Sequence, residues 1–189
     1  TKGHDFPALT LVGVIDADQG LFGTDFRASE RLAQSFVQVA GRAGRADRPG
    51  EVLIQTASPE HPLLTTLVNE GYAAFAERAL AERREAGWPP FGFLALLRAE
   101  AAQRDAAFEF LNAALAAATP LAHEGVHLLG PAPAPMERRQ GRFRGQLLVQ
   151  ATQRPALQAF LSPWRLALED LPASRRARWS LDVDPAELF

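Results

Sequence analysis

Leu-Thr-Leu-Val-Gly-Val-Ile-Asp at residues 9–16 is a nearly continuous run of β-branched and aliphatic side chains that ends in an acid. Such a run is typical of a strand that is buried on both faces, as in a parallel sheet. Ser29 is of a residue type that caps helices, and apolar side chains follow at helical spacing over residues 32–39. A second short apolar run at residues 51–56 predicts another strand. Strand, helix and strand in this order indicate an α/β layer.

After residue 56 the hydrophobic pattern is interrupted at two places, at Gly71 and at the pair Pro89 and Pro90. Residues 59–87 have helical periodicity, and we expect Gly71 to divide them into two helices. Pro89 and Pro90 then end the second helix, because proline cannot continue a helix. The pattern after the prolines predicts a β-α-β-β-α-β order, the ferredoxin-like split βαβ arrangement. The expected strands and helices of this arrangement cover residues 93–100, 105–118, 126–129, 146–151, 155–168 and 179–183.

The expected fold class is therefore α/β, organised in three parts. Residues 1–56 form the α/β part, residues 57–90 form a helical connector, and residues 91–189 form an α+β C-terminal domain. The chain has 189 residues, of which 47% are hydrophobic, and this is enough for a sizeable buried core. The net charge of -2 does not by itself indicate a nucleic-acid partner, so such a partner has to be inferred from local clusters of charge.

Composition argues against several kinds of site and location. The absence of cysteine excludes disulfides and thiolate zinc sites from this segment. No apolar run reaches the roughly 18 to 20 residues of a membrane helix and no signal peptide is visible, so we expect a cytoplasmic protein without a membrane partner. Asp16, Asp18 and Asp25 have a spacing that can bind hard cations, but the glycine and further acids of a calcium loop are missing. We expect no metal site and interpret these acids as groups that order Arg27 and Arg31.

The strongest chemical signal is Gln-Val-Ala-Gly-Arg-Ala-Gly-Arg at residues 38–45. Arg42 and Arg45 are three residues apart near the end of the predicted helix, so both guanidinium groups can point the same way. Gly41 and Gly44 have no side chains, so another surface can approach the backbone closely, and an arginine guanidinium can donate two parallel hydrogen bonds to phosphate oxygens. Such a pair in a cleft can stabilise the charge that builds on a transferred γ-phosphate. The alternative from the residues alone is a solvated basic turn, whose cations suit the C-terminal end of the helix dipole.

Two further basic clusters lie in the C-terminal part. Residues 138–144 carry four arginines and Phe143 between two predicted strands, where guanidinium groups can reach phosphates and the ring can stack on a base. The alternative is a solvated hairpin with Phe143 in the core. Arg154 and Gln158 lie at the start of a predicted helix, where the N-terminus attracts anions, and the alternative is an ordinary helix surface. We interpret the arginines of residues 175–178 as a solvated loop.

These motifs resemble those of a known family. Residues 38–45 look like motif VI of superfamily 2 helicases, Gln-x-x-Gly-Arg-x-Gly-Arg, and residues 1–7 resemble motif V. The finer sequence is similar to the PriA-type primosomal replication-restart DNA helicases, also called primosomal protein N′. The stretches that carry this similarity are residues 2–7, 16–18, 25–31, 39–46, 59–64, 81–84 and 181–185. Because the chain opens inside the motif V match and without an initiator methionine, we expect a C-terminal fragment of such a protein.

The resemblance implies an ATP-dependent DNA helicase of 3′ to 5′ polarity that binds stalled or branched replication forks and restarts replication. Residues 1–56 are then the C-terminal half of lobe 2 of a RecA-like motor. The Walker A loop for ATP, the ligands of Mg²⁺ and a zinc-binding cysteine region are expected upstream, so the fragment alone should not hydrolyse ATP. The implied catalytic residues are Gln38, Arg42 and Arg45, and the implied nucleotide-binding residues are Gly3, Asp5, Gly41 and Gly44.

The resemblance also implies partners in a bacterial cytoplasm. These are branched and single-stranded DNA, other primosome proteins, and the acidic tail of single-stranded DNA-binding protein, which matches the region of Arg154 and Gln158. The residues implied to bind DNA are Thr1, Lys2, Arg138, Arg139, Arg142, Phe143 and Arg144. One alternative is another superfamily 2 enzyme, such as a RecG-like fork translocase or an RNA helicase, against which residues 25–31 and the C-terminal domain argue. A second alternative is a non-catalytic nucleic-acid-binding module.

Overall fold

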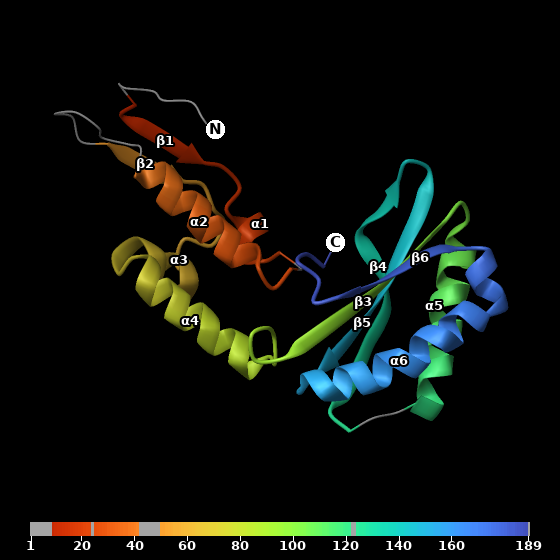
Figure 1. The fold of residues 1–189 in the computed structure, drawn as a ribbon. Helices are drawn as coiled ribbons and strands as arrows, with labels where there is room; N and C mark the ends of the chain where they lie inside the picture. The colour runs from red at the N-terminus through yellow and green to blue at the C-terminus, as the bar shows by residue number, and fades with distance from the viewer. Residues whose placement is uncertain (1–8, 24, 42–49, 122–123, 189) are drawn as a thin grey trace. The chain divides into compact units, whose positions relative to one another are not determined.

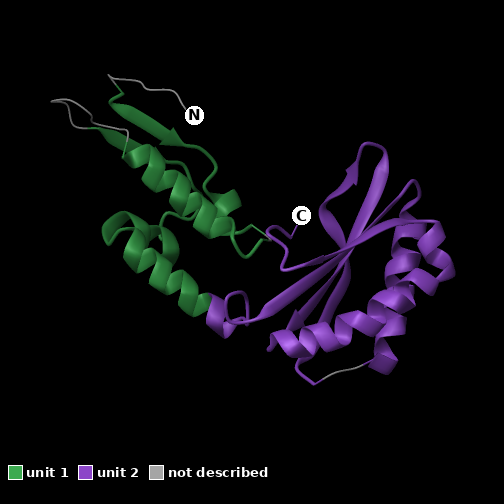
Figure 2. Ribbon diagram, in the orientation of Figure 1, with its two compact units in different colours: residues 1–82 green, residues 83–189 purple. Residues whose placement is uncertain are grey.

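The computed structural model describes residues 9–23, 25–41, 50–121 and 124–188, and the chain forms two compact units. Unit 1 is Thr1–Glu82 and unit 2 is Arg83–Phe189 (Figure 2). The elements up to the end of the first helical pair (Figure 1) are β1 (Leu11–Val14), α1 (Asp18–Leu21), α2 (Ala28–Ala40), β2 (Glu51–Ile54), α3 (Pro62–Asn69) and α4 (Tyr72–Glu85). The elements that follow are β3 (Phe93–Ala101), α5 (Arg104–Ala118), η1 (Thr119–Leu121), β4 (Val126–Arg139), β5 (Arg142–Ala151), α6 (Arg154–Asp170), η2 (Pro172–Arg175) and β6 (Arg178–Val183). The finer division into three parts stays a prediction.

A parallel pair of strands forms the sheet of unit 1. β1 and β2 pair in parallel with Leu11 opposite Glu51, and α2 lies between them in the chain, as the sequence predicts. The expectation that the first strand is buried on both faces is wrong for the described residues, because Leu11 and Leu53 are each 52% exposed. Among the described residues of unit 1 the sheet has two strands, and alternate side chains on these strands are exposed.

A buried carboxylate organises the start of α2. Asp25 is 3% exposed, accepts a hydrogen bond from the backbone N–H of Arg27 at 3.0 Å, and forms an ion pair with the guanidinium of Arg31. The predicted ordering is therefore confirmed for Asp25 with Arg31, whereas Arg27 is bonded through its backbone N–H. Asp16 and Asp18 accept instead from other groups, the side chain of Gln19 and the Thr56–Ala57 segment. The prediction that Ser29 caps the helix is wrong, because α2 begins at Ala28 and Arg27 is its N-cap residue. The Asp25 carboxylate thus bonds the N–H of the N-cap residue Arg27, and no serine side chain caps this end of the helix.

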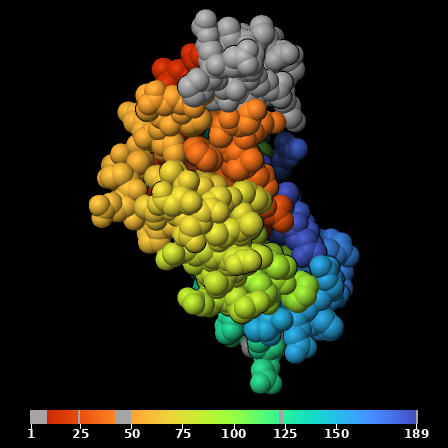
Figure 3. Space-filling model, turned by 90° about the vertical axis from the view of Figure 1, so that its left-hand side faces the viewer, coloured from red at the N-terminus to blue at the C-terminus, as the bar shows by residue number. Residues whose placement is uncertain are grey.

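Three helices pack around the apolar core of unit 1. Gly71 separates α3 from α4 as expected, because its φ of 89° lies in the left-handed region that favours glycine. His61 precedes α3, and its Nδ1 atom accepts a hydrogen bond from the N–H of Leu63 at 3.3 Å. Figure 3 shows α2 in orange beside α3 and α4 in yellow on one side of this unit. The shared core consists of Ala33, Leu63, Leu67, Phe75 and Ala79.

Asp18, the first residue of α1, connects that helix to the segment after β2. Its carboxylate accepts hydrogen bonds from Oγ1 of Thr56 at 2.6 Å and from the backbone N–H of Ala57 at 2.8 Å. The Thr56 hydroxyl and, to a smaller extent, the Ala57 amide hold the pKa of the Asp18 carboxyl below its ordinary value. Both bonds favour the ionised form, so they stabilise the folded state when Asp18 is charged.

Acidification is therefore expected to loosen this connection. Because the folded pKa of Asp18 is lowered, its contribution is fully present above the unfolded pKa of about 3.9 and is lost as the pH falls through the folded value. Asp18→Asn should remove this part of the pH dependence, measured as amide hydrogen exchange in β2 between about pH 6 and pH 3. Asp16→Asn is the control, because the Asp16 carboxylate accepts a hydrogen bond from the side chain of Gln19, three residues further along the chain. Parallel profiles for wild type and Asp18→Asn would contradict the expectation.

Unit 2 is a four-stranded antiparallel sheet with two helices on one face. The strand order is β4-β5-β3-β6, and α5 and α6 lie on the same side of the sheet (Figure 1). Trp164 of α6 is fully buried, and its Nε1–H donates to the carbonyl oxygen of Ala114 in α5 at 2.9 Å. The core between sheet and helices is formed by alternate strand residues, including Leu97, Leu147 and Val149. Side chains at the intervening strand positions therefore point to the second face, away from α5 and α6.

The long hairpin of β4 and β5 differs from the sequence prediction. We expected a strand over residues 126–129, but β4 extends to Arg139 with irregular pairing after Leu129 and after Pro133. The extension is possible because β4 is an edge strand, where a proline without an N–H leaves no ladder partner unsatisfied. Gln140 and Gly141 close the hairpin with φ values of 50° and 78°, which is the backbone required by a two-residue turn between twisted strands. The basic residues predicted for a loop therefore lie on paired strands.

Candidate functional site

Most residues of the two helicase-like motifs lie outside the described part of the chain. This holds for Thr1, Lys2, Gly3, Asp5, Arg42, Gly44 and Arg45. Of the remaining two, Gln38 is exposed near the end of α2, and Gly41 ends that helix with its N–H bonded to the carbonyl oxygen of Val37 at 3.0 Å. The structure thus places Gln38 and Gly41, which belong to the described part of the motif, at the end of α2, and the nucleotide-binding roles stay predictions.

The hairpin of β4 and β5 divides its basic cluster between the two faces of the sheet. Arg139 pairs with Arg142, whereas Arg138 pairs with Phe143 in the neighbouring register position. The guanidinium of Arg138 lies over the Phe143 ring at 5.3 Å, and Phe143 is half-buried opposite Ala101 of the core face. Because side chains alternate along a strand, Arg138 and Phe143 point to the helix side. The five residues that we predicted as one DNA-binding cluster are therefore not one surface.

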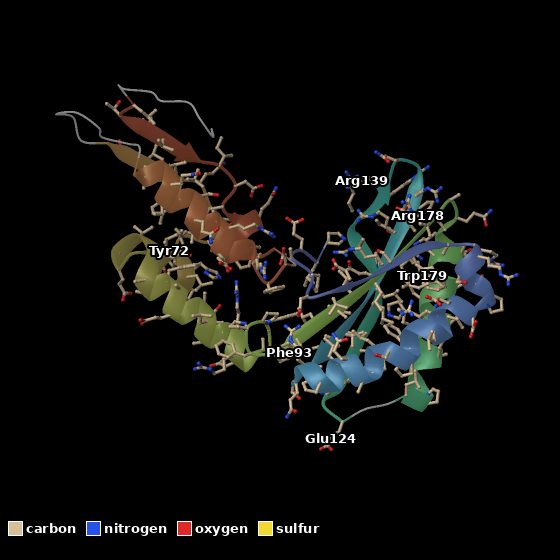
Figure 4. All side chains as sticks on the ribbon, in the orientation of Figure 1. Tyr72, Phe93, Glu124, Arg139, Arg178 and Trp179 are labelled. Atoms are coloured by element: carbon tan, nitrogen blue, oxygen red, sulfur yellow. The ribbon has the colours of Figure 1, made fainter. Side chains whose placement is uncertain are left out.

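The other three hairpin arginines belong to a hollow on the second face. The register places Arg144 of β5 opposite Glu100 of β3, and Glu100 opposite Arg178 of β6. The volume of the hollow is about 470 Å³. Figure 4 labels Arg139 and Arg178, which come from the two edge strands of the sheet. We call this feature the basic hollow and define it by its charged lining residues, Arg98, Glu100, Arg139, Arg142, Arg144 and Arg178.

The charges of the basic hollow are only partly compensated. Arg98 donates to the Asp182 carboxylate at 3.0 Å and to the carbonyl oxygen of Glu187 at 2.7 Å, so its guanidinium is held in place. Arg178 lies 3.7 Å from Glu100. Within the described residues, no ion pair is recorded for the remaining three arginines, which are Arg139, Arg142 and Arg144. Guanidinium groups of this kind bind phosphate and carboxylate oxygens through paired N–H donors.

Sequence reasoning missed three residues of this hollow, which are Arg98, Glu100 and Arg178. Arg98 and Glu100 belong to an expected strand and are given no role there, although two polar side chains two residues apart in an otherwise apolar strand indicate a polar region on one face of the sheet. Arg178 was interpreted as part of a solvated loop, and this is wrong because it is the first residue of β6. Arg176 forms an ion pair with Glu109 of α5. Only the pairing of β3 with both β5 and β6 brings these side chains together.

A second cluster lies at the start of α6. Arg154 follows the N-cap residue Gln153, and its guanidinium donates to the Asp184 carboxylate at 2.8 Å and lies 5.0 Å from the centre of the Phe93 ring. Gln158 is exposed one turn further along the helix. The structure therefore places Arg154 and Gln158 on one accessible helix end, with Arg154 already paired to an acid. Because the pair is exposed, its contribution to folding is small, about 0 to 1 kcal/mol.

Among residues 9–23, 25–41, 50–121 and 124–188, no group of three or more His, Cys, Asp and Glu side chains is arranged to hold a metal ion. The same residues contain no helix that is both long and apolar enough to span a bilayer.

Comparison with known proteins links both units to one kind of protein. The family model described as "Primosomal protein N C-terminal domain" matches residues 84–186. A protein named replication restart protein PriA from Haemophilus influenzae is 47% identical over 187 residues, which is 99% of this chain and 25% of that protein. Proteins of the same name from Synechocystis and Bacillus subtilis are 36% and 37% identical, over 100% and 85% of this chain and 22% and 20% of their own lengths. The chain thus spans no more than about a quarter of these relatives.

Proposed function

Because the chain belongs to the PriA family of replication restart proteins, we propose that it is part of an ATP-dependent 3′ to 5′ DNA helicase that recognises stalled or branched forks and assembles the primosome there. Unit 2 supplies a DNA-binding surface and unit 1 supplies part of the motor. The names of the relatives refer to replication restart, which supports a role of this chain in that process. The cytoplasm of a bacterium is the matching location.

The basic hollow is the observation that carries the DNA-binding proposal. Five arginines and one glutamate line it, so the excess charge is positive although the chain as a whole has a net charge of -2. Positive side chains that follow a nucleic-acid backbone provide most of the sequence-independent affinity by releasing condensed counterions. Arg139, Arg142 and Arg144 are the members best suited to phosphate, since no ion pair with another described residue occupies them. Arg138 and Phe143 would make separate contacts on the helix side.

The motor role of unit 1 rests on its motif residues. We propose that Gln38, Arg42 and Arg45 face the γ-phosphate of ATP held by an upstream lobe, with Gly41 and Gly44 allowing close approach. Gly3 and Asp5 contact the nucleotide, and Thr1 and Lys2 the DNA. The parallel β1–β2 pair and α2 support a RecA-like lobe for this unit. ATP, Mg²⁺ and Zn²⁺ would be held mainly by segments that precede these residues in the family.

Unit 2 adds a fold and a second contact to this proposal. Its β3-α5-β4-β5-α6-β6 order and antiparallel sheet support a ferredoxin-like domain. We propose that the exposed end of α6 at Arg154 and Gln158 binds the acidic tail of single-stranded DNA-binding protein. An arginine beside a helix N-terminus favours carboxylates, which supports this assignment. The tail would have to displace Asp184 from Arg154.

Replacing three arginines of the hollow by glutamine tests the DNA-binding proposal. Arg139→Gln, Arg142→Gln and Arg144→Gln together should weaken binding of a fluorescent forked or single-stranded DNA by roughly one to two orders of magnitude at about 0.1 M salt. The slope of log affinity against log salt should fall by about 2, since each single-strand phosphate contact contributes roughly 0.7. Fluorescence anisotropy of the 189-residue chain across a salt series measures both quantities.

The matched control carries the same change in net charge elsewhere. Its substitutions are Arg104→Gln, Arg165→Gln and Arg176→Gln, at arginines that pair with Glu137, Glu169 and Glu109 outside the hollow. This variant should keep nearly all affinity and an almost unchanged salt slope. An equal loss of DNA affinity in both variants would show that the effect comes from net charge and not from the hollow. An unchanged salt slope in the variant of Arg139, Arg142 and Arg144 would disprove phosphate contact by these arginines.

A further inference from the structure

Glu100 occupies the middle of the basic hollow. It lies on β3, between Arg144 of β5 and Arg178 of β6 in directly opposed register positions. Cβ atoms in such positions are about 4.5 to 5.5 Å apart, so the two arginine backbones lie roughly 10 Å apart with the glutamate between them. Arg98 lies two residues earlier on the same face of β3. The only carboxylate among the described charged lining residues is therefore surrounded by cations.

The surroundings of Glu100 make its charge important to any bound anion. Its side chain is 31% exposed, whereas the side chain of Arg178 is 81% exposed and 3.7 Å away at the closest pair of atoms. The carboxylate is thus the more enclosed partner and the arginine the more exposed one. A phosphate group placed between Arg144 and Arg178 would meet this negative charge, because like charges in direct contact are strongly unfavourable at an interface. A phosphate on the outer side of either arginine would not.

We propose that Glu100 determines the specificity of the basic hollow by keeping phosphate out of the space between Arg144 and Arg178. The hollow then accepts a nucleic-acid strand whose successive phosphates lie on either side of Glu100, with neutral sugar or base facing the carboxylate. A compact polyphosphate places its charges together and is rejected. This inference rests on the proposed DNA-binding function and adds the class of anion that the site selects. Glu100 also holds Arg178 at the site until the strand arrives.

Glu100→Gln tests the proposal because it removes the charge and retains the shape. The variant should bind a fluorescent single-stranded oligonucleotide about two- to fivefold more tightly than wild type, as expected for one partly exposed charge contact. Its salt slope should steepen by about 0.7, since Arg178 gains a phosphate in place of the carboxylate. Inorganic tripolyphosphate, added as a competitor, should gain more affinity than the oligonucleotide. Anisotropy with the 189-residue chain measures all three quantities.

Glu169→Gln is the matched control. Glu169 forms an exposed ion pair with Arg165 on α6, so this change alters net charge equally but lies outside the hollow. The control should bind both anions as wild type does. Equal gains in Glu100→Gln and Glu169→Gln, or no gain in Glu100→Gln, would overturn the proposal. A gain for DNA without a larger gain for tripolyphosphate would overturn the selection of spaced phosphates.

Two further measurements separate folding and the proposed function from this inference. If Glu100→Gln lowers Tm, Glu100→Thr gives the same test with a side chain that suits a strand. Loss of binding in the variant of Arg139, Arg142 and Arg144 with no response to Glu100→Gln would leave the DNA-binding function intact and remove only the inference. No response in either variant would remove both.

Discussion

Replacing Trp164 by alanine is expected to lower the free energy of unfolding of unit 2 by about 3 to 5 kcal/mol, the range for large-to-small changes at buried aromatic positions. Trp164 has no exposed surface, packs against Phe160 with ring centroids 5.2 Å apart, and donates its indole N–H to Ala114. The change removes apolar contact between α6 and α5 and leaves a cavity. Urea denaturation followed by far-UV circular dichroism measures the loss without relying on tryptophan fluorescence.

Leu166 supplies the control on the same helix. Its side chain is 56% exposed, so Leu166→Ala should change the free energy of unfolding by no more than about 0.5 kcal/mol. Trp164→Phe should lie between the two, because the ring remains while the hydrogen bond to Ala114 is lost. Equal losses of unfolding free energy in Trp164→Ala and Leu166→Ala would contradict the assignment of Trp164 to the core between the helices and the sheet. The basic hollow lies on the other face of that sheet.

Replacing Arg45 by alanine in the intact protein is expected to abolish DNA-stimulated ATP hydrolysis. An arginine that stabilises the transferred γ-phosphate contributes about 10³- to 10⁵-fold to the rate, so the remaining turnover should lie near background. Arg45 lies outside the described residues, and the expectation follows from its position in the motif at residues 38–45. A coupled ATPase assay with saturating single-stranded DNA measures the rate, and anisotropy should show that DNA binding persists.

Two variants make the ATPase result specific. Arg45→Lys should be nearly as inactive as Arg45→Ala, because lysine keeps the charge but lacks the planar fork of donors. Arg165→Ala removes an arginine that pairs with Glu169 on the surface of α6 and should leave hydrolysis unchanged. Normal turnover in Arg45→Ala would disprove the catalytic role and favour a non-catalytic binding module for this part of the protein.

Local signals explain why much of unit 2 could be predicted. The strand expected at residues 93–100 is Phe93–Ala101, and the helix expected at residues 105–118 is Arg104–Ala118. Alternating and helical periodicities are properties of short segments, so they survive without knowledge of the partner. The extension of β4 through its prolines was missed, because proline is tolerated there only on an edge strand. Edge position is a property of the whole sheet.

The amino-acid sequence by itself determined the strand and helix periods, the break at Gly71, and the clustering of arginine at residues 138–144. Only the tertiary structure decided that Arg138 and Arg139 serve opposite faces, and that Arg98, Glu100 and Arg178 share a hollow with Arg144. The physical reason is that local conformation depends on neighbours in the chain. Which side chains meet on one face of a sheet depends instead on the order of the strands and on their register. A shift of one residue in the register moves every side chain of a strand to the opposite face.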